Sequence, residues 1–469
     1  MSQTEDAVLV NNEVPSEEKP KLPAGIPYII GNEAAERFSF YGMKTILMLY
    51  MTQSLLTPMS KEEATGVIHM FNFAVYFLPF FGALLADLFW GKYKVIFYLS
   101  LVYCVGHLVL ALPCEAIGMT QKGALLLGLT IIALGSGGIK SCVSSFVGDQ
   151  FNSSNQSLMS NIYNWFYLAI NFGSFFSTLL TPWLREKYGP HVAFGVPGIL
   201  MAIATLVFWL GRKKYAKRTV STNNFLKEIK SKEGLQAIGK VLLIYLFLVP
   251  FWAMYDQTGS RWVEQGDSMD SRIFYQCTFL PDSVRNFEIL PDQMQALNPA
   301  LILGLIPLFT VAVYPFINKF INLTLVRKIK FGLIIGAIAS AFPLYFEYHR
   351  QGDVIALNQS WQILAYIIIT VAEILISVSS LELAYKQAPK TMKSLIMSFY
   401  TMPIAIGNLL VGSLNMLIDK NAHFACLKGT NYYMLFFVLL VIDVIGFFLI
   451  SRNFQEQTIL QDDEPETAE

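Results

Sequence analysis

A series of long apolar segments occupies most of the chain and limits it to a membrane fold. Segments such as residues 95–112 and 433–450 can each cross a bilayer as one helix, because about 20 apolar residues span its hydrocarbon core. A soluble domain carries roughly 25% charged residues, whereas this chain carries 14% and is 54% hydrophobic. The sequence therefore predicts an all-α membrane protein and nearly excludes a soluble one.

The apolar segments divide into two equal groups on either side of a basic linker, residues 212–237. The excess of Lys and Arg predicts that this linker is cytosolic, and an even number of spans then puts both termini in the cytosol. We expect two six-helix bundles, at 26–211 and 238–452. The tails, 1–25 and the acidic 453–469, are expected to be cytosolic, the first of them disordered. About twelve spans are predicted, beginning near Ile26, Thr65, Lys94, Gly123, Asn161, Val192, Ile238, Met294, Lys330, Trp361, Lys393 and Tyr432.

The first predicted span contains charged residues that lipid does not tolerate. Each charge near a helix centre costs about 2.5 to 3.5 kcal/mol on insertion scales, so these groups must face protein or water. They can pair locally and line a watered cavity, or form a self-neutralising cluster at a helix end. Offsets of three, four and seven residues place six side chains along one side of the helix: Glu33, Glu36, Arg37, Phe40, Tyr41 and Lys44.

Two isolated charges lie deep in later spans. Lys140 follows a glycine-rich stretch of the fourth span, and a buried lysine needs a carboxylate, for which Glu33 or Glu36 is the natural partner. That pair could also be purely structural. Glu373 stands among apolar residues of the tenth span without a cation within one helical turn, so it either binds an amine from elsewhere or takes part in a hydrogen bond between helices.

Two further groups are candidate proton sites. His69 lies near the start of the second span, and an imidazole with an ordinary pKa of about 6.5 can hold a transported proton. Asp256 in the seventh span is the second candidate. For both, a hydrogen-bonded structural role is the alternative.

Several motifs in this order resemble those of one family of transporters. Glu-Ala-Ala-Glu-Arg-Phe-Ser-Phe-Tyr-Gly at residues 33–42 resembles the ExxERFxYYG motif of the proton-coupled oligopeptide transporter family. Five other segments are similar to family signatures, and together they cover essentially the whole membrane region: 138–151, 166–174, 251–262, 291–295 and 373–394.

This resemblance implies a fold and a function. The fold would be that of the major facilitator superfamily, two six-helix bundles around a central cavity. The function would be proton-coupled symport of di- and tripeptides by alternating access, with protons as coupling ion, no cofactor and no enzymatic activity. The partners would be peptides, protons and the lipid bilayer of the plasma membrane, or of the inner membrane in a bacterium. Nucleic acid is not expected, since the formal net charge is zero.

The resemblance also implies roles for individual residues. Protonation of the glutamates of the first span would free Lys140 and Arg37 to hold the peptide carboxylate. Glu373 would receive the peptide amino terminus, helped by Asn171 and Asn298. A dipeptide separates its charged ends by roughly 7 Å. The proton-coupling residues would be Glu33, Glu36, His69 and Asp256, and the remaining substrate-binding residues Lys44 and the aromatic walls Tyr41, Tyr76, Tyr167, Trp252 and Tyr400.

Departures from the family pattern keep alternatives open. The motif's tyrosine is Phe40 here, and its later arginine is Lys44, so one hydroxyl and one bidentate group are missing. A proton-coupled symporter of another small solute, such as nitrate or an amino acid, and a transport-inactive peptide sensor are the rival functions. The cysteines show no metal-ligand spacing, and a bond between Cys277 and Cys426 is left open.

Overall fold

In the ranges that the structure describes, the chain forms helices joined by turns and loops. The one extended pairing among them is a single bridge between Asp270 and Asn358, so the predicted all-α class is confirmed. Nine helices are long and apolar enough to cross a membrane, and a bent pair, Ile238–Leu246 with Val249–Asp267, would make ten. The computed structural model describes residues 21–152, 155–216, 232–275, 278–351, 357–387 and 399–453.

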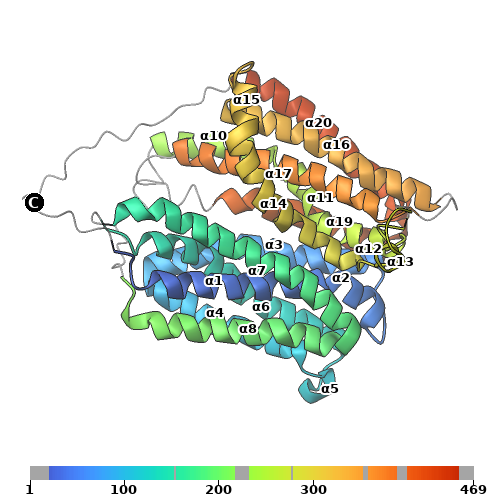
Figure 1. Ribbon diagram of the computed structural model, residues 1–469, viewed down its shortest axis with the longest axis horizontal. Coiled ribbons are helices and arrows are strands. Elements are labelled where there is room, and N and C mark those ends of the chain that lie inside the picture. Colours follow the sequence, from blue (N-terminus) through green and yellow to red (C-terminus); the bar gives the residue numbers. More distant parts are fainter. Residues whose placement is uncertain are drawn as a thin grey trace, which may run out of the picture.

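The first half of the chain forms a bundle of long helices, blue to green in Figure 1. Two short helices, α2 (Leu47–Leu49) and α5 (Cys114–Ile117), lie in its connections. The long helices are α1 (Ile26–Thr45), α3 (Lys61–Leu85), α4 (Lys92–Ala111), α6 (Gln121–Gly148), α7 (Met159–Tyr188) and α8 (Pro190–Leu210).

The second half forms another bundle, which lies along the first and is coloured green to red in Figure 1. Its elements are α10 (Lys232–Leu246), α11 (Val249–Tyr255), η5 (Asp256–Gly259), α12 (Arg261–Asp267), α13 (Asp282–Arg285), η6 (Pro291–Ala296), α14 (Leu297–Leu308), η7 (Phe309–Val313), α15 (Tyr314–Asn318), α16 (Leu325–Gln351), α17 (Ser360–Gln387), η9 (Phe399–Thr401), α19 (Met402–Lys420), η10 (Ala422–Leu427) and α20 (Thr430–Ile450).

Each bundle has its own hydrophobic core. Apart from Val263, the buried members of the first core lie between Ile26 and Tyr215, whereas those of the second lie between Val241 and Phe447. The chain therefore buries its apolar surface in two halves on either side of the basic linker.

Two of the long helices are too polar to count as membrane spans by composition. α1 carries the charged motif, and α7, 30 residues long, contains polar residues such as Asn164 and Asn171. Both fall outside the nine helices that are apolar enough, so the count of twelve spans stays a prediction. The start of the predicted eleventh span, Lys393, lies outside the described residues.

The helix that follows the linker is broken twice. It stops after α10 and resumes at α11, where Pro250 occupies the first turn, a position that suits proline because it needs no backbone donor. It then tightens into the 3₁₀ turn η5 and kinks at Ser260, whose φ and ψ are −137° and −86°. Broken helices free polar groups in the middle of a membrane bundle, and Asp256 and Ser260 stand at this break.

The helix ends define two ends of the molecule. α1 begins beside the end of α8, where Lys214 Nζ donates to the hydroxyl of Tyr28 at 2.8 Å. We call this the linker end, because the basic linker leaves from it, and we call the opposite end the far end.

Candidate functional site

A cavity of about 300 Å³ lies between the two bundles, a size typical of a small-molecule site. Both bundles contribute to it, and most of the residues expected to bind substrate line it. The predicted residues in its wall are Tyr41, Lys44, Tyr76, Tyr167, Asn171, Trp252, Asp256, Asn298, Glu373 and Tyr400. Arg37, Lys140, Glu33, Glu36 and His69 are not among the lining residues.

Glu373 on α17 forms an acidic group in the wall of the second bundle. Its Oε2 accepts a hydrogen bond from Asn298 Nδ2 at 2.6 Å, and the same amide lies 3.2 Å from Thr370 Oγ1. No cation of the described chain lies within ion-pair distance of this carboxylate. A carboxylate facing a cavity without a protein counter-ion is suited to an amine that enters from outside.

Lys44 and Asp256 form a cation and anion pair across the cavity, from α1 to η5. Lys44 Nζ lies 3.9 Å from Asp256 Oδ1. The other oxygen of Asp256 accepts a short hydrogen bond from Asn408 Nδ2 on α19. The two bundles therefore meet in one polar chain at the cavity wall.

The same polar chain extends to His69 behind the wall. His69 Nδ1 donates to Asn408 Oδ1 at 2.7 Å, and Nε2 lies 2.9 Å from Ser260 Oγ. Because the amide oxygen only accepts, the neutral imidazole carries its hydrogen on Nδ1 and accepts from the serine hydroxyl at Nε2. His69, fully buried, is thus linked through one amide to Asp256.

The glutamates of the first span pair with their own helix neighbour. Arg37 Nε donates to Glu33 Oε1 at 2.6 Å and lies 3.0 Å from Glu36 Oε2. All three side chains are buried. The side chains expected to line one watered cavity along α1 therefore fall into two groups. Glu33, Glu36 and Arg37 pair with one another, whereas Tyr41 and Lys44 line the cavity.

Lys140 does not have the carboxylate partner that the sequence suggested. Its ammonium lies 3.8 Å from the centre of the Phe40 ring and 4.7 Å from that of Tyr76, and no acid of the described residues lies within ion-pair distance of it. Arg37 forms ion pairs with both glutamates instead. The negative faces of these two rings attract the ammonium through cation–π interactions. One of the rings, Phe40, stands where the family motif has tyrosine.

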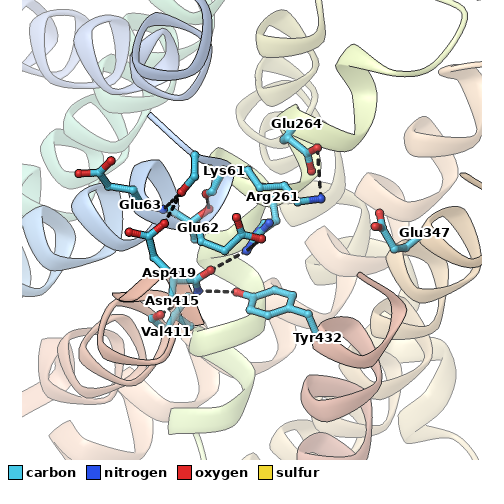
Figure 2. A network of polar contacts seen from close by, with 12 residues as sticks. Lys61, Glu62, Glu63, Arg261, Glu264, Glu347, Val411, Asn415, Asp419 and Tyr432 are labelled. Atoms are coloured by element: carbon cyan, nitrogen blue, oxygen red, sulfur yellow. Dashed lines mark hydrogen bonds and ion pairs between the residues drawn. The ribbon is translucent and has the colours of Figure 1, made fainter. Parts of the chain in front are cut away.

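Polar ties join the bundles at the far end. Figure 2 shows Arg261 of α12 donating to Asn415 of α19, at 2.7 Å, and Asn415 donating to the Tyr432 hydroxyl at 2.9 Å. Glu62 of α3 lies 3.5 Å from the same guanidinium. We call these four residues the far-end network.

Other ties cross between the bundles beside the far-end network. Ser60 Oγ donates to Asp419 at 2.6 Å, and Gln53 Nε2 donates to Asp267 at 2.6 Å. The Arg185 guanidinium lies 3.1 Å from Asp292. The far end is therefore closed by contacts between polar groups of both bundles.

Arg261→Gln is expected to destabilise the protein by about 1 to 3 kcal/mol, because it leaves the buried Glu62 carboxylate and the Asn415 oxygen without their charged donor. The thermal unfolding midpoint in detergent measures this loss. Arg272→Gln serves as control, since its side chain pairs with Asp270 in a loop and is 37% exposed, and exposed pairs contribute about 0 to 1 kcal/mol. Equal midpoints for Arg261→Gln and the wild type would contradict the prediction.

Sequence reasoning missed the residues that connect the predicted ones. Asn408 joins His69 to Asp256, and Arg261 joins the bundles through Glu62. The sequence held one signal for each: a lone amide inside an apolar span, and an arginine within the segment 251–262. Cys426 is a free thiol, and Cys277 lies outside the described residues.

Comparisons with known proteins agree on one family. A family model described as "PTR2: POT family" matches residues 93–232 and 219–428. Peptide transporter family 1 of Drosophila melanogaster is 37% identical over 357 residues, which are 67% of this chain and 46% of the relative. Solute carrier family 15 member 2 of Rattus norvegicus is 37% identical over 387 residues, 72% of this chain and 51% of the relative. The chain thus spans about half the length of these curated relatives.

Solved structures share the whole architecture. The crystal structure of an auto-inhibited POT family peptide transporter is 32% identical with a TM-score of 0.82, covering 94% of this chain and 99% of that one. The POT family transporter PepTSo is 34% identical with a TM-score of 0.81, covering 92% and 98%. The predicted major facilitator architecture is therefore confirmed at the level of the fold.

Proposed function

Because the chain belongs to the POT family of transporters, which are not enzymes, we propose that it is a symporter that imports di- and tripeptides together with protons by alternating access. The relatives named peptide transporters support the substrate class.

The observation that carries the peptide assignment is Glu373 in the cavity wall, which within the described part of the chain is bound by neutral groups such as Asn298. A simple anion such as nitrate would be repelled by this carboxylate, whereas a peptide ammonium would be attracted. The aromatic walls tolerate varied side chains. Lys44 lines the same cavity, and Lys140 and Arg37 stand behind it as further cations for the peptide carboxylate.

Proton coupling would use the acidic groups near these cations. A proton on Glu36 would release one of the two carboxylates that engage Arg37, so that the guanidinium can turn toward a peptide carboxylate. The chain from His69 through Asn408 to Asp256 offers a second route that crosses from one bundle to the other. Protons are the coupling ion in this proposal, and no cofactor takes part.

The proposed orientation follows from the basic linker. The chain is an integral membrane protein, and we assign it to the plasma membrane, or the inner membrane if the source is bacterial. The linker and both termini would face the cytosol, so the bundles 26–211 and 238–452 would be tied together on the outer side.

An inward proton gradient is expected to drive accumulation of a labelled dipeptide into proteoliposomes. A gradient of one pH unit stores about 1.4 kcal/mol per proton, enough for about tenfold accumulation if one proton accompanies each peptide. Uptake with and without the gradient, and the pH change on adding peptide, measure the coupling.

Other results of this experiment point to the rival functions. Equal uptake with and without the gradient would contradict proton coupling. Saturable binding without any accumulation would identify a sensor. Driven uptake of nitrate or a free amino acid, with no uptake of dipeptide, would overturn the peptide assignment.

A further inference from the structure

The interior of the first bundle contains buried polar groups that the peptide cavity does not use. They form two stripes, one on α1 and one on α4, and Ser39 of the first is hydrogen-bonded to His107 of the second. One stripe is Asn32, Glu36 and Ser39 on α1, and the other is Ser100, Tyr103 and His107 on α4. We call these six residues the α1–α4 seam.

The polar groups of the seam are fully buried and only partly hydrogen-bonded. All six side chains are 0% exposed. One hydrogen bond within it is formed, between Ser39 Oγ and His107 Nε2 at 2.8 Å. Four other polar groups of the seam have atoms without a hydrogen-bond partner among the described residues: the Asn32 amide, Glu36 Oε1, Ser100 Oγ and His107 Nδ1. The other oxygen of Glu36 lies 3.0 Å from Arg37 Nε.

Orphaned polar groups continue from the seam to α6. Ser136 Oγ is also fully buried and unpartnered within the described chain. Its neighbour Gly135 lies so close to α4 that an added Cβ would stand 2.7 Å from the backbone nitrogen of Tyr103. Buried polar groups in proteins are normally satisfied, and where protein offers no partner, an internal water with two to four polar neighbours does so.

The surroundings of His107 contain few charges. On α1, Glu36 and Arg37 interact electrostatically with Tyr103, which lies one helical turn before His107. α8 packs Gly198 against the His107 Cβ, 3.0 Å from an added Cβ. α6 presents no charged group to the ring in the part of the chain that the structure describes, since its Lys140 lies over Phe40 and Tyr76. Glu36 is therefore the one acid of the described residues that shares the seam with His107.

We propose that the α1–α4 seam holds internal water and carries a proton between Glu36 and His107, so that His107 is a second proton site outside the peptide cavity. In the step, the protonated Glu36 carboxyl gives its proton to a seam water, which passes a proton to His107 Nδ1. The ring nitrogen Nε2 keeps its hydrogen and donates to Ser39 Oγ. The carboxylate of Glu36 and the imidazolium of His107 are the products. This proposal rests on the proposed proton-coupled transport.

The variant His107→Gln separates proton binding from packing. A glutamine amide can keep the hydrogen bond to Ser39 but cannot bind a proton at neutral pH. Tyr103→Phe removes only the hydroxyl from the middle of the seam. The matched control is His191→Gln, because that histidine is exposed and bonds only to the backbone oxygen of Ala111 at 3.1 Å.

Uptake and exchange assays in proteoliposomes provide the first test. His107→Gln should remove the accumulation, about tenfold, that a gradient of one pH unit drives, whereas exchange of labelled for unlabelled peptide without a gradient should stay near the wild-type rate. Tyr103→Phe should act in the same direction, and His191→Gln should change neither assay. Unchanged accumulation in His107→Gln, or loss of exchange together with accumulation, would overturn the proposal.

A spectroscopic test does not depend on transport. The chain has five histidines, so ¹⁵N-histidine spectra in lipid bilayers can be assigned by single variants. Glu36→Gln should shift the ring signals of His107, because it removes the seam's acid, while Glu63→Gln at the far end should leave them unchanged. A His107 signal indifferent to Glu36→Gln would overturn the proposal. A wild type that does not transport would contradict the proposed function and leave this measurement to decide about the seam.

Discussion

Lys140→Ala is expected to abolish gradient-driven dipeptide uptake. The ammonium lies against Phe40 and Tyr76, next to a cavity wall to which Tyr76 itself belongs. Its removal takes away a cation that can bind the peptide carboxylate. It also takes away a positive charge that interacts with Glu36 of α1. Uptake into proteoliposomes with an inward proton gradient measures the loss.

Lys122→Ala on the same helix is the matched control for Lys140→Ala. Lys122 is half exposed and forms a surface ion pair with Glu63 at the far end, and such pairs contribute little. The control should transport like the wild type. Normal driven accumulation in Lys140→Ala would reduce this lysine to a packing role and leave Lys44 as the cation that receives the carboxylate.

Glu373→Gln is expected to weaken dipeptide binding by about ten- to a hundredfold, because it removes a charge-assisted bond worth roughly 1.5 to 3 kcal/mol. N-acetylation of the peptide should weaken wild-type binding comparably. The two losses should not add, since a peptide without its ammonium has no charge for Glu373 to recognise. Calorimetric binding of both peptides to both proteins measures all four values.

Glu382→Gln is the control for this cycle, because Glu382 lies on the same helix but does not line the cavity. It should bind both peptides like the wild type. If free and acetylated peptides bind the wild type equally, or if the two penalties simply sum, the ammonium lies elsewhere in the cavity and the proposed peptide orientation is wrong.

Properties that depend on one helix at a time could be predicted from the sequence. Most helices begin within a few residues of the predicted starts, as α8 does at Pro190 and α20 at Thr430, because apolar length fixes where a helix can enter a bilayer. The family motifs also placed Glu373 and Tyr41 at one cavity. This was possible because the family resemblance implies which helices face the same cavity.

Contacts between helices distant in sequence could not be predicted in the same way. Lys140 was assigned to a glutamate, but Arg37 sits one turn from Glu33 and reaches it first. The bridge through Asn408 depends on a helix break that brings Ser260 to His69. Neither the spacing of residues along one helix nor hydropathy shows which residue of another helix lies next to them.

The ties at the far end limit how firmly the two halves can hold together. A hydrogen bond contributes about 0.5 to 1.5 kcal/mol net, so contacts between the bundles such as Gln53 with Asp267 and Ser60 with Asp419 sum to only several kcal/mol. Inverting a population from 1:99 to 99:1 takes about 5.5 kcal/mol. Closure built from many weak contacts is therefore of the size that the binding of a small solute can reverse in every turnover, whereas a hydrophobic interface of the same area would hold the protein in one state.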